Sequence, residues 1–168
     1  NLFYCIQQLA VAIGPALIKY LNKNVLDLML QCYPTKYMQC TLKTIIEKMP
    51  SLELIINERL CLSLSKMLYG TKFIISGNHP TVKAVNIKEA RKYRNRVYFN
   101  ANRESNTDEN DNELLIQALN MIVDVSEKIH LSNLVNLVII HYIEHDDPEV
   151  RKLSALIACK VCAKLDKY

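Results

Sequence analysis

Apolar residues recur three and four positions apart through most of this sequence, and proline or glycine separates the stretches that show this spacing. The first stretch carries its stripe at Leu2, Cys5, Ile6, Leu9 and Ile13. Breaks follow at Gly14-Pro15, Pro34, Pro50-Ser51, Gly70 and Pro148. This spacing is that of one face of an α-helix, and the alternation typical of strands is absent. The pattern therefore predicts amphipathic helices joined by short turns.

The composition narrows the fold class further. Three glycines in 168 residues are few for β-sandwiches and barrels, whose turns need residues with positive φ, and they leave no Gly-rich phosphate loop. Half of the residues are hydrophobic, which is enough for a folded core. The formal net charge of +4 is mild, so we expect no dedicated nucleic-acid binder.

Two features of the sequence bear on the cellular compartment in which the chain functions. No uninterrupted apolar run approaches the roughly 18 residues of a membrane helix, so we expect no membrane span. The six cysteines stand in helix-patterned stretches, where a free cysteine behaves as a small buried hydrophobe, and this favours a reducing compartment. We expect a cytoplasmic protein, peripheral at endomembranes only through partners. Because the chain starts in mid-pattern at Asn1, we also expect a segment of a longer protein.

The helical pattern stops between residues 71 and 112. The sequence thus divides into helix pairs over 1–70, an inserted basic-then-acidic loop over 71–112, and a helix pair plus a following helix over 113–168. We expect one short helix in the loop, near 86–93. The candidate partner-contact residues are Lys88, Arg91, Lys92, Tyr93, Arg94 and Arg96. Their mixture of bases and aromatics fits a solvated mobile loop, a docking loop for an acidic protein, or an RNA-binding loop.

One turn near the C-terminus is the most informative motif for the fold. Its residues are Asp147, Pro148, Val150, Arg151 and Ala155. Aspartate can cap a helix, proline suits the first helical turn, and valine can enter the core. We expect the arginine to pair with a nearby aspartate and the alanine to allow close helix packing. The string resembles the Asp-Pro-x-Val-Arg turn of HEAT repeats, which predicts an all-α HEAT/armadillo-type α-solenoid of antiparallel helix pairs with one long inserted loop.

A more specific resemblance covers most of the chain, from about Gly14 to Ala163. The segments 14–21 (GPALIKYL) and 56–68 (INERLCLSLSKML) are similar to helices in the N-terminal HEAT region of the target of rapamycin (TOR) kinases. Lys72-Phe73 and Gly77 to Pro80 fall where that family has a basic-aromatic turn and a loop. The long insertion departs from the family pattern and leaves its own role open.

The resemblance implies a non-catalytic scaffold within a very large ATP-dependent serine/threonine kinase of the phosphatidylinositol-3-kinase-related group. It implies binding of a Raptor-type regulatory subunit in nutrient and growth (TORC1) signalling, and a dimer formed through the parent protein. In that family ATP and Mg²⁺ bind far downstream, so no cofactor is expected in this segment. The sequence itself has no Gly-rich loop, catalytic loop or Asp-Phe-Gly motif of a kinase.

No catalytic, cofactor-binding or metal-binding residue is predicted. Cys159 and Cys162 have the spacing of a metal or redox pair, but structural zinc needs four ligands, and we expect both to pack in the core. His141 and His145 share a helix face without the Glu-x-x-His context of a metalloprotease. Two other functions stay open: a free-standing HEAT or armadillo adaptor, as in transport or phosphatase scaffolds, and a helical nucleic-acid-binding domain.

Overall fold

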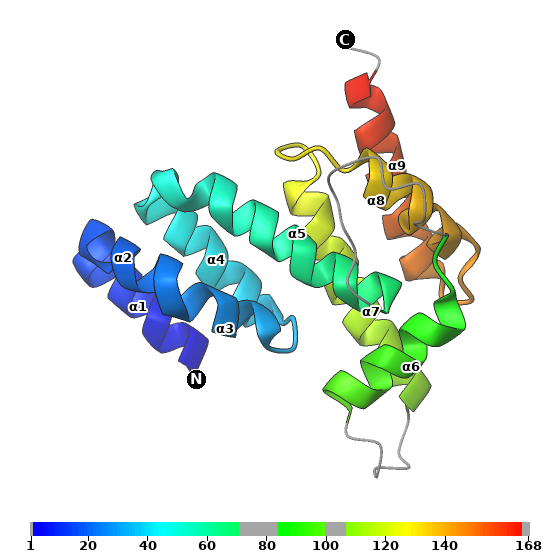
Figure 1. The fold of residues 1–168 in the computed structure, drawn as a ribbon, viewed down its shortest axis with the longest axis horizontal. Coiled ribbons are helices and arrows are strands. Elements are labelled where there is room, and N and C mark those ends of the chain that lie inside the picture. The colour runs from blue at the N-terminus through cyan, green and yellow to red at the C-terminus, as the bar shows by residue number, and fades with distance from the viewer. Residues whose placement is uncertain (1, 71–83, 100–106, 166–168) are drawn as a thin grey trace. The chain divides into compact units, whose positions relative to one another are not determined.

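The computed structural model describes residues 2–70, 84–99 and 107–165, and every regular element in these ranges is helical (Figure 1). The predicted all-α class is therefore confirmed. By their contacts the residues form two compact units, 1–60 and 61–168, which are described separately. The elements are α1 (Leu2–Ile13), η1 (Gly14–Leu17), α2 (Ile18–Tyr20), η2 (Leu21–Val25), α3 (Leu26–Gln31), α4 (Lys36–Lys48), η3 (Pro50–Leu52), α5 (Glu53–Tyr69), α6 (Ile87–Tyr98), α7 (Thr107–Val125), α8 (Ser132–Leu137), η4 (Ile139–Glu144) and α9 (Pro148–Leu165).

In the first unit, α1 packs against α4 and runs in the same direction. The Thr41 hydroxyl donates to the Phe3 carbonyl at 3.1 Å, and Gln7 Nε2 donates to Thr44 Oγ1 at 2.9 Å. The contact on α4 thus advances as the chain advances along α1, at sequence separations of 38 and 37. Because α2 and α3 connect the two helices, alternate helices are parallel, as stacked antiparallel pairs require.

The helix that connects α1 to α4 contains a wide turn. Residues Leu21–Val25 form a π-helical turn, η2, between α2 and α3. Arg59 on α5 holds this turn, since its Nη1 donates to the Asn22 carbonyl at 3.0 Å and its Nη2 donates to Asn22 Oδ1 at 3.0 Å. Asp27 accepts a further bond from Arg59 Nη1 at 3.1 Å. The arginine thereby satisfies polar groups where the regular helical ladder is interrupted.

The stripe predicted to face inward on α1 is only partly buried. The helix buries Ile6 and Ala10, whereas Leu2, Leu9 and Ile13 are 68%, 48% and 48% exposed. The whole run Leu2–Gln31 is the one helical stretch of the described residues that is long and apolar enough to cross a membrane, with a window of mean hydropathy 1.4. Length and composition alone do not establish a span, because core helices of soluble proteins share them.

In the second unit, α7 and α9 repeat this parallel arrangement. Asn112 Nδ2 donates to Asp147 Oδ2 at 3.3 Å, and Lys160 Nζ pairs with Glu127 Oε1 at 2.6 Å. The sequence separations are 35 and 33, a little under the spacing near 40 expected for HEAT-type repeats. Here α8 and η4 form the intervening helix and pack on α9.

Gly70 ends α5 and makes room for the next helix. Its φ is +89°, which favours glycine, and its amide donates to the Lys66 carbonyl at 2.9 Å. A Cβ at this position would lie 2.6 Å from the Ala90 Cα on α6. The glycine predicted as a helix stop therefore also permits close approach of a helix that belongs to the insertion.

The described part of the insertion is more ordered than predicted. The helix expected near 86–93 extends over Ile87–Tyr98, and Asn86 caps it through a bond from the Glu89 amide. The Val85 amide donates to the Leu137 carbonyl at the end of α8. Lys72, Phe73 and residues 77–80, which carried part of the family resemblance, lie outside the described residues.

Three residues of cap-forming type lie near helix starts. Helix α7 begins at Thr107, so Asn112 lies inside the helix. Ser132 is the first residue of α8, which has no side-chain cap. Ser51 lies within the turn η3. In each case a cap-forming residue type stands near the helix start, but the backbone begins its first turn earlier.

Candidate functional site

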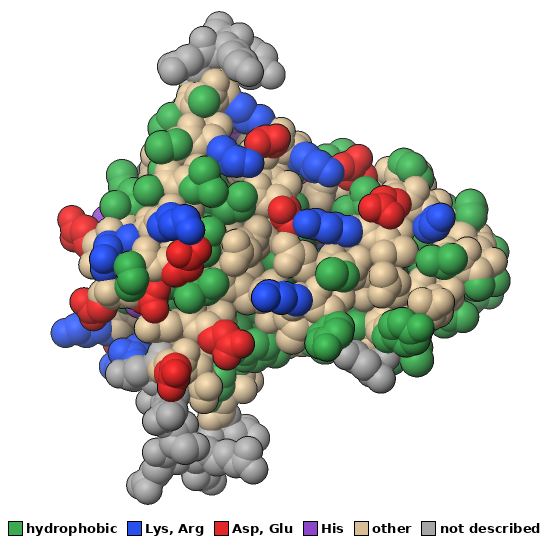
Figure 2. Space-filling model, turned by 180° about the vertical axis from the view of Figure 1, so that it is seen from behind, with side chains coloured by type: hydrophobic (Ala, Val, Ile, Leu, Met, Phe, Trp, Pro, Cys, Tyr) green, Lys and Arg blue, Asp and Glu red, His purple; other side chains and the backbone are tan. Residues whose placement is uncertain are grey.

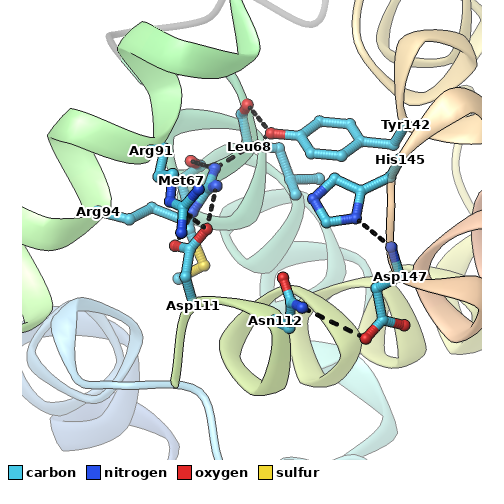
Figure 3. A network of polar contacts seen from close by, with 9 residues as sticks. All are labelled: Met67, Leu68, Arg91, Arg94, Asp111, Asn112, Tyr142, His145 and Asp147. Carbon is cyan, nitrogen blue, oxygen red and sulfur yellow. Dashed lines mark hydrogen bonds and ion pairs between the residues drawn. The ribbon is translucent and has the colours of Figure 1, made fainter. Parts of the chain in front are cut away.

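A buried ion pair joins the inserted helix to the helix core of the second unit (Figure 3). Arg94 of α6 and Asp111 of α7 have side chains 0% and 2% exposed. Arg94 Nε donates to Asp111 Oδ1 at 2.6 Å, and its Nη2 donates to Oδ2 at 2.7 Å. This is the bidentate geometry that matches a planar guanidinium to a carboxylate. Arg91, about one turn earlier, reaches Asp111 at 3.9 Å.

The same arginine also contacts the end of α5 and the intervening helix. Its Nη1 donates to Tyr142 Oη at 3.1 Å and lies 3.5 Å from the Met67 carbonyl. The fully buried Tyr142 hydroxyl donates in turn to the Leu68 carbonyl at 2.8 Å. The carbonyls of a helix's last turn have no partner within the helix, so this network satisfies the end of α5 with side chains from α6 and η4.

The surroundings of Arg94 and Tyr142 fix the protonation state of each side chain. Burial alone would lower the pKa of Arg94, but its bonds to Asp111 and Tyr142 and the charge of Asp111 outweigh that effect and raise it. Burial raises the pKa of Tyr142, and the nearby arginine offsets this only in part. The guanidinium therefore stays charged and the phenol stays protonated, as their donor roles require.

The predicted HEAT-type turn lies beside this network. Asp147 caps α9, because its Oδ1 accepts from the amides of Glu149 at 2.8 Å and Val150 at 3.2 Å. His145 stacks on Tyr142 with ring centroids 6.0 Å apart, and its Nδ1 accepts from the Asp147 amide at 3.1 Å. That bond needs an unprotonated Nδ1, and burial lowers the pKa of His145 accordingly. Asn112, bonded to Asp147, connects the turn to α7.

The remaining residues of the motif are placed as follows. Pro148 opens α9 and Val150 is fully buried. Arg151 does not pair with an aspartate side chain as predicted: its Nη1 donates to the carbonyls of His145 at 2.7 Å and Asp146 at 2.8 Å. Ala155 is half-buried. The motif thus closes the turn mainly through backbone groups.

The predicted partner-contact residues separate into an inner and an outer set. Arg94 is buried and cannot contact a partner, and Arg91 and Tyr93 are half-buried. Lys88, Lys92 and Arg96 are exposed. We call these three residues the α6 basic ridge. They stand at i, i+4 and i+8, where each pair of like charges destabilises a helix by about 0.2–0.5 kcal/mol.

On the face of the molecule drawn in Figure 2, lysine and arginine side chains lie among acidic and hydrophobic ones. Exposed hydrophobic side chains of α6 include Val97, which is 48% exposed. Beside the ridge, Lys66 Nζ lies 6.0 Å from the centre of the Tyr93 ring. The surface is therefore mixed in character, as in many protein-binding surfaces.

Five of the six cysteines differ from the prediction. Only Cys61 is buried, and burial raises the pKa of its thiol to about 12. Cys159 and Cys162, expected in the core, are exposed on α9. Within residues 2–70, 84–99 and 107–165 no group of three His, Cys, Asp or Glu side chains is arranged to hold a metal ion.

These features define a helical segment built from stacked pairs, whose buried and half-buried polar side chains connect helix ends and turns. No protein-family profile matches the sequence. The chain is 44% identical to the serine/threonine-protein kinase TOR2 of Saccharomyces cerevisiae over 166 residues, which is 99% of this chain. The chain is therefore similar to a segment of a TOR kinase, and it spans 7% of the length of that relative. This similarity confirms the resemblance to TOR kinases and supports HEAT-like repeats.

Proposed function

We propose that this chain is a non-catalytic HEAT-repeat scaffold segment of a TOR-type serine/threonine kinase that binds regulatory subunits in nutrient and growth signalling. The observation that carries the proposal is the 44% identity to the yeast kinase over 99% of this chain. The matching residues of that relative lie inside a much longer protein, which favours a kinase segment over a free-standing adaptor.

Several details of the fold support a scaffold role. Every regular element of the described residues is helical, whereas a kinase domain needs a sheet to cover ATP. Stacked helix pairs offer extended surfaces to other proteins. We propose a Raptor-type regulatory subunit as the partner, TORC1 signalling as the setting, a cytoplasmic location with attachment to endomembranes through partners, and dimer formation through the parent protein. ATP and Mg²⁺ would act elsewhere in that protein, and this segment would need no cofactor.

The experiment uses the whole kinase that carries this segment. Asp111→Ala removes the partner of buried Arg94, and Asp27→Ala removes an exposed partner of Arg59 as a matched control. We expect Asp111→Ala to lower the amount of regulatory subunit that copurifies with the kinase. Phosphorylation of a short peptide that needs no recruitment should stay unchanged. Full recovery of the subunit, when limited proteolysis shows that α6 has opened, would overturn the scaffold role.

A further inference from the structure

The α6 basic ridge and the buried Arg94 lie on opposite sides of one helix. At about 100° per residue, Lys88, Lys92 and Arg96 fall within an arc of about 80°. Arg94 points about 160° away from Lys92. The side of α6 that carries Arg94 therefore packs into the core, and the side that carries the ridge is exposed.

The charges of the ridge are largely uncompensated. Lys92 Nζ lies 2.9 Å from Glu89 Oε1, and both side chains are well exposed. Lys88 and Arg96 form no ion pair with any residue that the structure describes. Three cations in line along a helix repel one another, so the fold does not gain stability from this arrangement.

The ridge is held in a fixed position. Arg94 connects α6 to α7 and η4, and the Gly70 backbone allows Ala90 to approach the end of α5. A partner would thus meet a preformed surface and would not pay the entropy of ordering a loop. This argues against the solvated mobile loop considered from the sequence.

We propose that the α6 basic ridge docks an acidic segment of a protein, with carboxylates spaced about one helical turn apart. The inference rests on the proposed function, since it assumes that the segment presents its surface to proteins. Glu89 beside the ridge and exposed Val97 suit a polypeptide better than a phosphate backbone. Three cations on a chain of net charge +4 also make a small footprint for nucleic acid.

The test measures binding of fluorescein-labelled probes to the full 168-residue chain by fluorescence anisotropy at low salt. The first probe is an alanine-based helical peptide of about 16 residues, roughly four turns, with glutamate at every fourth position. The second replaces each glutamate with glutamine, and the third is an oligothymidylate of the same length. The ridge variant is K88E/K92E/R96E. The matched control, K23E/K36E/K48E, makes the same charge change at exposed lysines of the first unit.

We expect the glutamate peptide to bind, and the ridge variant to bind it at least about tenfold more weakly, because three exposed charge pairs are lost. The control variant should keep most of the affinity. An equal loss in both variants, equal binding of the glutamine peptide, or tighter binding of oligothymidylate would each overturn the proposal. Circular dichroism of both variants shows whether they fold.

The two proposals can fail separately. If the ridge binds the glutamate peptide while Asp111→Ala opens α6 to proteolysis and leaves regulatory-subunit recovery intact, the ridge stands and the scaffold role falls. If recovery depends on Asp111 while the glutamate peptide binds the ridge variant as well as the unchanged chain, the scaffold role stands and the docking site lies elsewhere.

Discussion

Replacing Asp111 with alanine should destabilise the second unit far more than any exposed ion pair could. The substitution leaves the Arg94 guanidinium, 0% exposed, without the carboxylate that accepts its two short bonds. An uncompensated buried charge of this kind costs about 3–5 kcal/mol. The exposed pair of Arg59 with Asp27, whose side chains are 33% and 59% exposed, should contribute only about 0–1 kcal/mol.

The assay is urea unfolding of the 168-residue chain, followed by circular dichroism. Hydrogen exchange locates the loss, which should appear in α6 and α7. The double variant R94M/D111L should recover most of the lost stability, because it removes both charges and keeps apolar bulk. The reasoning is refuted if Asp111→Ala and Asp27→Ala cost the same, or if the double variant is less stable than Asp111→Ala alone.

Three other predictions follow from the structure. Gly70→Ala should lower the free energy of unfolding by more than about 1 kcal/mol, measured by thermal unfolding, because it combines a positive φ with a clash. Gly14→Ala, at φ +44° in open space, should lower it less. Equal losses would contradict this prediction. Since burial lowers the pKa of His145 below 6.5, its contribution to stability should be complete above pH 6.5 and lost as pH falls from there toward the lower folded pKa. His145→Asn, whose Oδ1 can still accept from the Asp147 amide, should remove that part of the pH dependence of the urea midpoint, and an unchanged slope would refute it. Iodoacetamide at pH 8 should modify the five exposed thiols of the folded chain but not Cys61, whose pKa is about 12. Mass spectrometry of the native and urea-unfolded chain measures this, and labelling of Cys61 in the native chain would contradict the prediction.

The sequence predicted the fold class because helical periodicity and turn residues act locally. Pro148 begins a helix and Gly70 ends one, as their backbone preferences require. On α1, periodicity could not decide which of two apolar stripes is covered, since Ile6 and Leu9 both satisfy the helical spacing. Only the packing partner, α4, makes that distinction.

The buried network could not be predicted in the same way. Helix α6 is polar on average, and an arginine on such a helix is ordinarily exposed. Arg94 differs from Arg96 only in the side of the helix on which it lies, and its partner Asp111 stands 17 residues further along, beyond the undescribed residues 100–106. One weak signal was available: the short residue Ala90 stands four positions before Arg94 and marks the face that packs closely.

The place of α6 in the core has an evolutionary consequence. A segment between two helix pairs can often be shortened or lost, but here the removal of α6 would leave Asp111 and the Tyr142 hydroxyl without their common donor. A descendant lineage that loses Arg94 must therefore also exchange Asp111 for an uncharged residue. We expect these positions to change together or not at all, and the insertion to be retained wherever its aspartate partner is retained.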